Sequence, residues 1–223
     1  MADNGTILVL PGGGYHLHAA HEAEPVAEWL ESLGWRARVV RYPVLAQHPI
    51  PLDAVRAEIR AERAAGAGLV GLLGFSAGGH LAGHAALAPD SSPEERVDFA
   101  VLGYPVTSMV VDPHLGSRRA LLGPEDRHAD AVAISLETLV TPASPPLFLW
   151  HTAEDASVPV SHTYRLGERL AASGVPHEVH VFAGDVHGIG LGEGTAASAW
   201  TTLCANWLER VRNIAGPRGV LVP

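Results

Sequence analysis

The chain contains no lysine at all and only one cysteine, Cys204, among its 223 residues. A single thiol cannot form an intramolecular disulfide, and Cys204 lies in an apolar-periodic segment, so we expect a buried core residue. The 24 acidic residues outnumber the 15 basic ones, which are all arginine, and the formal net charge is -9. An acidic surface repels phosphate backbones, so we expect no nucleic-acid partner.

Long apolar runs are also missing, since no stretch approaches the roughly 20 apolar residues that a membrane-spanning helix requires. The first residues lack a basic segment followed by an apolar one, which is the pattern of a signal peptide. We therefore expect a cytoplasmic protein that does not contact membranes.

Motifs for metals and cofactors are absent as well. The sequence has no H-E-x-x-H pattern, no cysteine pair, no G-x-x-x-x-G-K-[ST] and no G-x-G-x-x-G, so we expect neither a metal nor a cofactor. Two histidine groups remain as metal alternatives. The first is His16, His18 and His21. The second is His80 and His84, spaced one helical turn apart, of which His80 is expected to pack behind the loop that precedes it.

The composition, with 47% hydrophobic and 17% charged residues, is that of a chain with a large core. Short apolar runs alternate with helical patterns, which predicts a mostly parallel sheet of about six strands flanked by helices in a single domain, residues 1–223. The expected strands are Thr6–Leu10, Arg36–Arg41, Leu69–Gly74, Asp98–Gly103, Pro146–His151 and Glu178–Phe182. The expected helices are Ala23–Leu33, Leu52–Ala65, Ser76–Leu87, Val160–Ala172 and Ala196–Val211.

Two proline-containing stretches interrupt this alternation. Tyr42–Pro51 contains three prolines and is expected to be a loop. Tyr104–Pro145 has room only for short helices, around Ser117–Leu122 and Glu125–Ile134. This second stretch is the only candidate lid and is modest, so no large cap is expected.

The strongest motif is the pentapeptide Gly74-Phe75-Ser76-Ala77-Gly78, a G-x-S-x-G between an apolar strand and a helix. Glycines relieve the crowding of such a tight turn and leave the serine exposed at the carboxyl edge of the sheet. The helix N-terminus beneath the serine favours developing negative charge. These features predict that Ser76 is a catalytic nucleophile.

The first strand leads directly into a glycine-rich loop, Pro11-Gly12-Gly13-Gly14-Tyr15. Acyl transfer needs two N–H donors aimed at the tetrahedral oxyanion. One donor is expected from Ala77, the residue after the nucleophile, and the other from Gly13 or Gly14. These residues predict an oxyanion hole.

The candidate acid and base lie in loops that follow two later strands. In α/β hydrolases the acid and then the histidine come after the serine, which indicates Asp155 as the acid and His187 as the base. Glu154 and Asp185 are rival acids. The residues Tyr15, Tyr42, Tyr104 and Val158, by their positions after strand ends, are expected to line the substrate pocket.

These motifs, together with RYPV, LGYPVTSM, LFLWHTAEDASVPV and VHGIGL, resemble the bacterial α/β hydrolases grouped with acetyl esterases and acetyl-xylan-esterase-like lipases, the BD-FAE-type esterases. The resemblance runs from about Thr6 to Leu208. It implies a triad of Ser76, Asp155 and His187, and hydrolysis of short acyl esters such as those of acetylated carbohydrates.

The chain departs from this family pattern in two respects. Pro11 stands where lipases of this kind have a histidine before the glycines, which removes a supporting hydrogen bond. Five residues precede the first strand, so the sheet is expected to lack the two N-terminal strands of a full α/β hydrolase. The strand Arg36–Arg41 is then expected at an edge, which motivates the hypothesis of a homodimer paired through it.

Two other functions remain open from the sequence. The same triad serves lactone, formamide or peptide hydrolysis, and a peptidase needs an amine-binding carboxylate, for which Glu22, Glu24 and Asp185 are candidates. The third alternative is a non-catalytic ligand-binding member of the fold, which would have no need of the triad and the glycine loop together.

Overall fold

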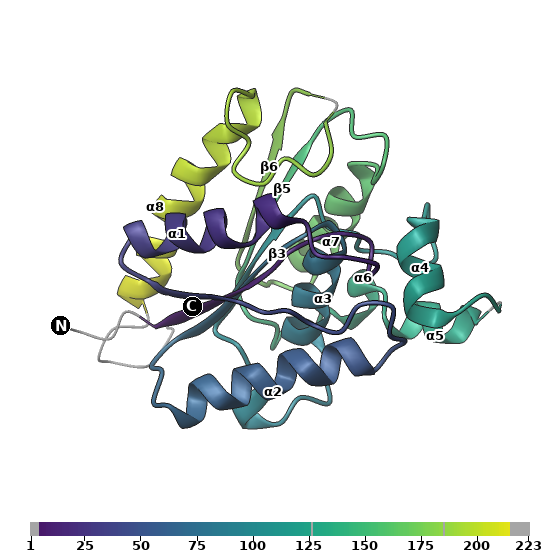
Figure 1. The fold of residues 1–223 in the computed structure, drawn as a ribbon, viewed down its shortest axis with the longest axis horizontal. Helices are drawn as coiled ribbons and strands as arrows, with labels where there is room; N and C mark the ends of the chain where they lie inside the picture. Colours follow the sequence, from purple (N-terminus) through teal and green to yellow (C-terminus); the bar gives the residue numbers. More distant parts are fainter. Residues whose placement is uncertain (1–4, 126, 185, 215–223) are drawn as a thin grey trace.

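The computed structural model describes residues 5–125, 127–184 and 186–214 (Figure 1). Six strands form one sheet in the order β2-β1-β3-β4-β5-β6, and every neighbouring pair is parallel. The strands are β1 (Thr6–Leu10), β2 (Arg36–Val39), β3 (Val70–Phe75), β4 (Phe99–Gly103), β5 (Leu147–Thr152) and β6 (His177–Phe182). The predicted six-stranded sheet is confirmed, with β2 at one edge.

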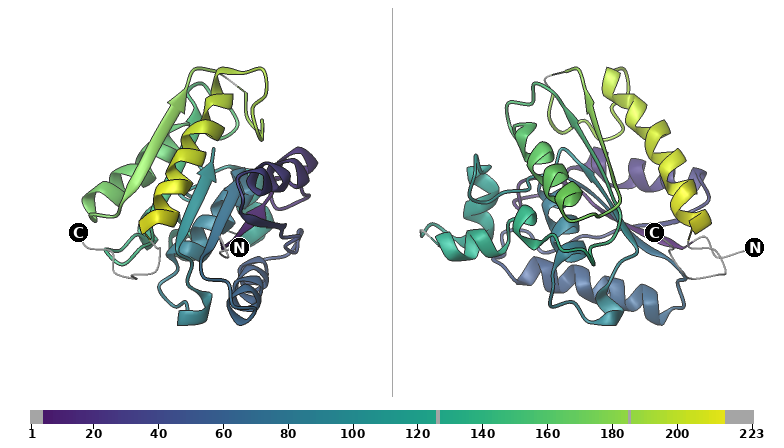
Figure 2. Two further views of the ribbon diagram at one scale, coloured as in Figure 1. Left: turned by 90° about the vertical axis from the view of Figure 1, so that its left-hand side faces the viewer. Right: turned by 180° about the vertical axis from the view of Figure 1, so that it is seen from behind.

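Helices cover both faces of the sheet (Figure 2). The long ones are α1 (Glu24–Ser32), α2 (Ile50–Ala64), α3 (Ser76–Leu87), α7 (Ser161–Ala172) and α8 (Ala199–Ile214). Three short ones lie between β4 and β5: α4 (Leu115–Leu122), α5 (His128–Ala133) and α6 (Leu136–Leu139). Three 3-10 turns complete the set: η1 (Ala20–Glu22), η2 (Pro93–Glu95) and η3 (Ala196–Ser198). Among the described residues, no helix has the length and apolarity to cross a bilayer.

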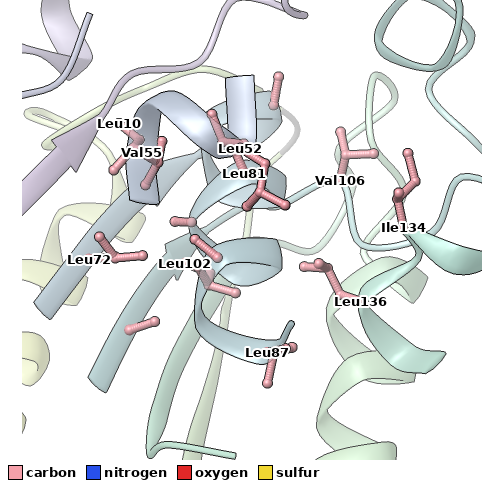
Figure 3. Packing of buried hydrophobic residues seen from close by; sticks show 14 of the residues in the cluster. Leu10, Leu52, Val55, Leu72, Leu81, Leu87, Leu102, Val106, Ile134 and Leu136 are labelled. Carbon is pink, nitrogen blue, oxygen red and sulfur yellow. The ribbon is translucent and has the colours of Figure 1, made fainter. Parts of the chain in front are cut away.

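The alternation of strand side chains divides the core into two layers. In β1, Ile7 and Val9 pack with α1 and α8, while Leu8 and Leu10 pack with α2, α3 and α7. Figure 3 shows the second layer, in which Leu10 and Leu72 of the strands meet Leu81 of α3. Burial on both faces explains why these strands read as continuous apolar runs.

Cys204 is fully buried in the layer formed with α8, as its sequence context predicts. The predicted helix Glu125–Ile134 is shorter in the structure, and Asp126 within it lies outside the described residues. The helix α2 begins two residues earlier than predicted, because a proline is tolerated in the first helical turn. The segment that includes α4 and α5 stands apart from the sheet at one side of the molecule (Figures 1 and 2).

Candidate active site

Ser76 lies at the junction where β3 ends and α3 begins, with a backbone φ of 52°. The two flanking glycines are required by close contacts. A Cβ on Gly78 would overlap the carbonyl oxygen of Leu10, and a Cβ on Gly74 would overlap the backbone of Gly78. The strand, turn and helix therefore fit together only without these side chains, and the turn holds the Ser76 hydroxyl at the carboxyl end of the sheet.

Three side chains from separate loops form a hydrogen-bonded series at this position. The Ser76 Oγ lies 2.8 Å from Nε2 of His187, and Nδ1 of His187 lies 2.6 Å from Oδ2 of Asp155. The loops follow β3, β6 and β5 respectively, and parallel strands bring their carboxyl ends to one edge. The sequence-predicted nucleophile, base and acid are thus adjacent in the structure. A carboxylate on Nδ1 leaves Nε2 free to accept the serine proton.

The surroundings of Asp155 hold its carboxyl group ionised. The backbone N–H groups of Ser157 and Val158 donate to Oδ1 at 2.8 and 3.0 Å. Burial alone would raise the pKa of Asp155, but hydrogen bonds from His151 and His187 outweigh it and hold the pKa well below its ordinary value. Of the rival acids, Glu154 is exposed, and Asp185 lies outside the described residues.

The buried His151 was not anticipated from the sequence. Its Nε2 donates to the carbonyl oxygen of Val158 at 2.9 Å and lies 3.3 Å from Oδ2 of Asp155. Its Nδ1 accepts from the hydroxyl of Thr163 at 2.7 Å. The ring therefore fixes the loop that carries the acid and places a second N–H beside the carboxylate oxygen that His187 contacts.

The glycine-rich loop passes directly over the nucleophile, since a Cβ on Gly12 would lie 3.1 Å from the Cβ of Ser76. The Gly12 N–H donates to Oε2 of Glu22 at 2.7 Å. Gly13 and Gly14 have φ values of 123° and 64°, which only glycine adopts readily. Neither of their N–H groups donates to another group of the described chain, so both are free for a ligand.

Ala77 is the second residue of α3. The N–H groups in the first turn of a helix have no intrahelical acceptor. They point out of the helix N-terminus, which is the positive end of the helix dipole. Ala77 therefore adjoins Ser76 at the start of α3, and Gly13 and Gly14 follow Gly12, the loop residue that lies against Ser76.

Two groups support the glycine loop where related lipases use a histidine. The Tyr42 hydroxyl donates to the carbonyl oxygen of Pro11 at 2.6 Å, and Glu22 accepts the Gly12 N–H. Both supporting residues are buried. The supporting role of Glu22 was missed by sequence reasoning, because nothing in the local pattern distinguishes it from the acidic residues around it.

The four expected pocket residues lie beneath the site rather than on its surface. Tyr15, Tyr42, Tyr104 and Val158 are at most 1% exposed. Because side chains with so little exposed area offer no contact to a substrate, the prediction that they line an open pocket is wrong. Tyr15 donates its hydroxyl to Nδ1 of the buried His80 at 2.7 Å, and His80 Nε2 donates to the Ile134 carbonyl at 2.8 Å.

The hydrogen bonds with Tyr15 and Ile134 fix His80 as a neutral side chain behind the nucleophile turn. This is the position that the sequence analysis expected. Burial lowers the pKa of His80 to about 4. Among the described residues, no group of three or more histidine, cysteine and acidic side chains is placed to hold a metal ion. The alternatives at His16 and His21 are engaged otherwise, with the carbonyl oxygens of Gly14 and Gly188 respectively.

His114 lies beside the glycine-rich loop and was not anticipated. Its ring lies 3.8 Å from where a Cβ on Gly14 would be. Its Nδ1 accepts the Ser117 N–H at 3.2 Å and so caps α4. Burial and the nearby charge of His187 lower its pKa. The short helix α4 is thereby placed beside the oxyanion loop.

The parallel sheet, the strained serine turn and the Ser-His-Asp series define a serine hydrolase of the α/β-hydrolase type. Comparison with known proteins agrees with this class. The chain belongs to the prolyl oligopeptidase family, whose model matches residues 52–214. The resemblance to α/β hydrolases of the acetyl-esterase group, stated from the sequence, is confirmed.

Among solved structures, the chain is similar to an acetyl ester-xyloside bifunctional hydrolase from Caldicellulosiruptor lactoaceticus, with 39% identity and a TM-score of 0.87. That match covers 93% of this chain and 83% of the other. Among curated proteins, it is 32% identical to endo-1,4-beta-xylanase B of Butyrivibrio fibrisolvens over 87% of this chain. It is also 36% identical to an acetylxylan esterase of Xylanibacter ruminicola over 46% of this chain. The chain matches only 34% and 23% of the lengths of these two curated relatives.

Proposed function

We propose that the protein is a serine esterase that hydrolyses short-chain acyl esters, acetyl esters foremost, with acetylated carbohydrates as the substrate class. The observation that carries this proposal is the hydrogen-bonded series from Ser76 Oγ through His187 to Asp155, at 2.8 and 2.6 Å. The similarity to an acetylxylan esterase and to an acetyl ester-xyloside bifunctional hydrolase supports the choice of an acetyl group and of a carbohydrate.

The first half of the reaction forms an acyl-enzyme. Ser76 Oγ attacks the ester carbonyl carbon while His187 Nε2 takes the hydroxyl proton, and the carbonyl oxygen becomes an oxyanion. The N–H of Ala77 and that of Gly13 or Gly14 stabilise this oxyanion. When the C–O bond to the alcohol breaks, the imidazolium of His187 returns the proton to the leaving oxygen. The ionised Asp155 stabilises the imidazolium during this step.

The second half consumes one water. His187 Nε2 takes a proton from that water, whose oxygen attacks the acyl carbon and forms a second oxyanion in the same hole. The bond to Ser76 Oγ then breaks, and Oγ recovers the proton from His187. The products are the carboxylic acid and the free serine hydroxyl, and the enzyme has not changed its protonation.

Ester hydrolysis fits the described site better than peptidase activity. A peptidase that binds a substrate amine needs a carboxylate without other partners. Both of the described candidates already have partners. Glu22 is buried and accepts two hydrogen bonds, and Glu24 is paired with Arg41 at 2.6 Å.

The direct test compares the wild type with Ser76→Ala on p-nitrophenyl esters from acetyl to octanoyl. We expect the highest kcat/KM on the acetyl ester, and a loss of several orders of magnitude in the variant. Acetate release from acetylated xylo-oligosaccharides then tests the carbohydrate. Equal activity of the two proteins would contradict the nucleophile assignment, and a preference for octanoyl would contradict the acyl preference.

A further inference from the structure

The side chain of Glu22 is the most deeply buried carboxylate next to the nucleophile turn outside the triad, and it has a donor at each oxygen. The Gly12 N–H donates to Oε2 at 2.7 Å, and the Tyr104 hydroxyl donates to Oε1 at 2.6 Å. The residue is 1% exposed. Because the Gly190 N–H donates to the same Tyr104 hydroxyl at 2.8 Å, the phenolic proton is directed to Glu22.

These contacts join three segments that are far apart in the sequence. Gly12 belongs to the glycine-rich loop, and Tyr104 follows β4. Gly190 belongs to the loop that carries His187, and Trp200 of α8 holds it by donating Nε1–H to its carbonyl oxygen at 3.1 Å. The Tyr104 ring packs edge-on against the His187 ring, with centroids 4.9 Å apart at 64°. A single carboxylate therefore connects the oxyanion loop to the support of the base.

A neighbouring contact reinforces the same connection. His21, which precedes Glu22 in η1, has Nε2 2.7 Å from the carbonyl oxygen of Gly188, the residue after His187. A Cβ on Gly188 would lie 3.9 Å from Oε1 of Glu22. The turn η1 thus touches the oxyanion loop and the histidine loop at once.

We propose that Glu22 is a positioning residue that sets the orientation of the oxyanion donors relative to His187, an inference that rests on the proposed acyl transfer. By accepting the Gly12 N–H, Glu22 fixes the peptide plane between Pro11 and Gly12, whose carbonyl oxygen is held by the Tyr42 hydroxyl. The amides of Gly13 and Gly14 donate to no other group of the described chain and then remain free for the oxyanion. Hydrogen bonds to an ionised acceptor are about twice as strong as neutral ones, which suits a group that holds a loop in place.

The effect of Glu22 falls on the transition state. The ground-state carbonyl of the ester uses the oxyanion hole only weakly, whereas the tetrahedral oxyanion depends on donors placed within a few tenths of an ångström. We expect Glu22→Ala to lower kcat by about 10²-fold, as loss of one oxyanion donor does, with KM changed less than about threefold.

Glu22→Gln tests whether hydrogen bonds without the negative charge are enough to position the glycine-rich loop. Its amide oxygen can accept the Gly12 N–H while its NH₂ donates to the Tyr104 hydroxyl, so we expect kcat within about tenfold of the wild type.

The matched control is Glu62→Ala. Glu62 is also buried and accepts from Thr6 Oγ1 at 3.0 Å and Arg38 Nε at 3.2 Å, away from the glycine loop. We expect this control to lose stability and keep kcat.

The experiment measures kcat and KM on p-nitrophenyl acetate, together with thermal melting and the rate of fluorophosphonate labelling of Ser76, for all four proteins. Glu22→Ala with kcat within twofold of the wild type, or with its loss matched by Glu62→Ala, overturns the proposal. If Glu22→Ala does not fold, Glu22→Asp replaces it. That variant keeps the charge but withdraws the carboxylate by one methylene, and an unchanged kcat again overturns the proposal.

The labelling rate separates this inference from the proposed function, because phosphonylation uses the same hole and base without an ester substrate. A wild type that is labelled at Ser76 but hydrolyses no ester contradicts the esterase assignment. In that case, a labelling rate lowered by about 10²-fold in Glu22→Ala still supports the positioning role, and an unchanged labelling rate overturns it. A wild type that is neither labelled nor active overturns both.

Discussion

Ser76 holds a left-handed backbone conformation, φ 52°, that residues other than glycine rarely adopt. Tyr15 and Tyr104, with φ of 66° and 34°, are also in this region, and both lie next to the site. Such strain persists only where the surroundings over-determine it. Here the packed tyrosines, their hydrogen bonds and the flanking glycines provide that constraint, and the strain is concentrated where the donors and the nucleophile meet.

The acid offers the sharpest prediction at this scale. In Asp155→Asn the side chain keeps its size, but the neutral amide no longer stabilises the imidazolium or the tautomer that presents Nε2 to the serine. We expect kcat to fall by about 10⁴-fold on p-nitrophenyl acetate with little change in the melting temperature. Glu154→Gln, at the exposed neighbour, is the control and should keep full activity. If Glu154→Gln lost activity and Asp155→Asn kept it, Glu154 would be the acid instead.

At the scale of elements, the nucleophile turn is a tightly packed junction. β1, β3 and α3 approach so closely that Gly78 lies against the carbonyl oxygens of Leu10 and Pro11. Backbone atoms cannot move aside as a flexible side chain does. The turn therefore depends on the register of β1 beside β3 as much as on its own five residues.

Gly78→Ala tests this junction. The added methyl group would overlap the Leu10 carbonyl oxygen, so the helix must shift away from β1. We expect a clear drop in melting temperature together with a loss of activity, because Ser76 moves with the helix. Gly68→Ala is the control, since a Cβ there meets nothing within 4 Å. Equal melting temperatures for the two variants would contradict the steric account.

The strands and long helices could be predicted because their signals are local. The predicted bounds of β1 and α3 match the structure, and the other strands differ by one or two residues at their ends. The helix α6 could not be predicted. Its single turn is held by Leu136, which fills the space above Gly83 of α3, and that contact joins residues 53 positions apart.

The candidate site shows the same division. Ser76, Asp155 and His187 were predictable because Ser76 directly follows β3 and the other two lie in the loops after β5 and β6. Parallel strands bring such residues together at one edge of the sheet. The tyrosines were misplaced because the positive φ of Tyr15 and Tyr104 accompanies side chains that point into the core, which the order of residues does not reveal. Glu22 was missed because its partner Tyr104 is 82 residues away.

For the whole molecule, burial makes several histidines resist protonation. Burial lowers the pKa of His80 to about 4 and that of His84 well below its ordinary value of 6.5. In the unfolded chain both titrate near 6.5. Between these values the unfolded state binds protons that the folded state does not, so the free energy of unfolding falls as the pH drops.

The stability contributed by neutral His80 is therefore complete above pH 6.5 and is lost as the pH falls toward 4. The slope is about 1.4 kcal/mol per pH unit for one such group. Urea unfolding at pH 7, 6 and 5 measures it, and we expect the midpoint to fall at each step. A midpoint that stays constant from pH 7 to pH 5 would contradict the neutral buried state of these rings.

The homodimer expected from the sequence would pair through the edge strand β2, which carries Arg36 and Arg38. The amides of Arg36 and Val40 donate inward to β1, so by alternation the amides of Ala37 and Val39 face outward. We propose that two copies pair through this edge. Light scattering over a concentration series should show a dimer that Ala37→Pro abolishes, because proline removes one outward donor. A monomer mass throughout the series would count against pairing.

The central claim is that Ser76 is the nucleophile of a serine hydrolase, and covalent labelling tests it most directly. The wild-type protein is treated with a fluorophosphonate, and its intact mass and proteolytic peptides are measured by mass spectrometry. The account predicts one adduct per chain, located on Ser76 and absent from Ser76→Ala. An adduct on another residue, or an active wild type that takes up no label, would contradict it.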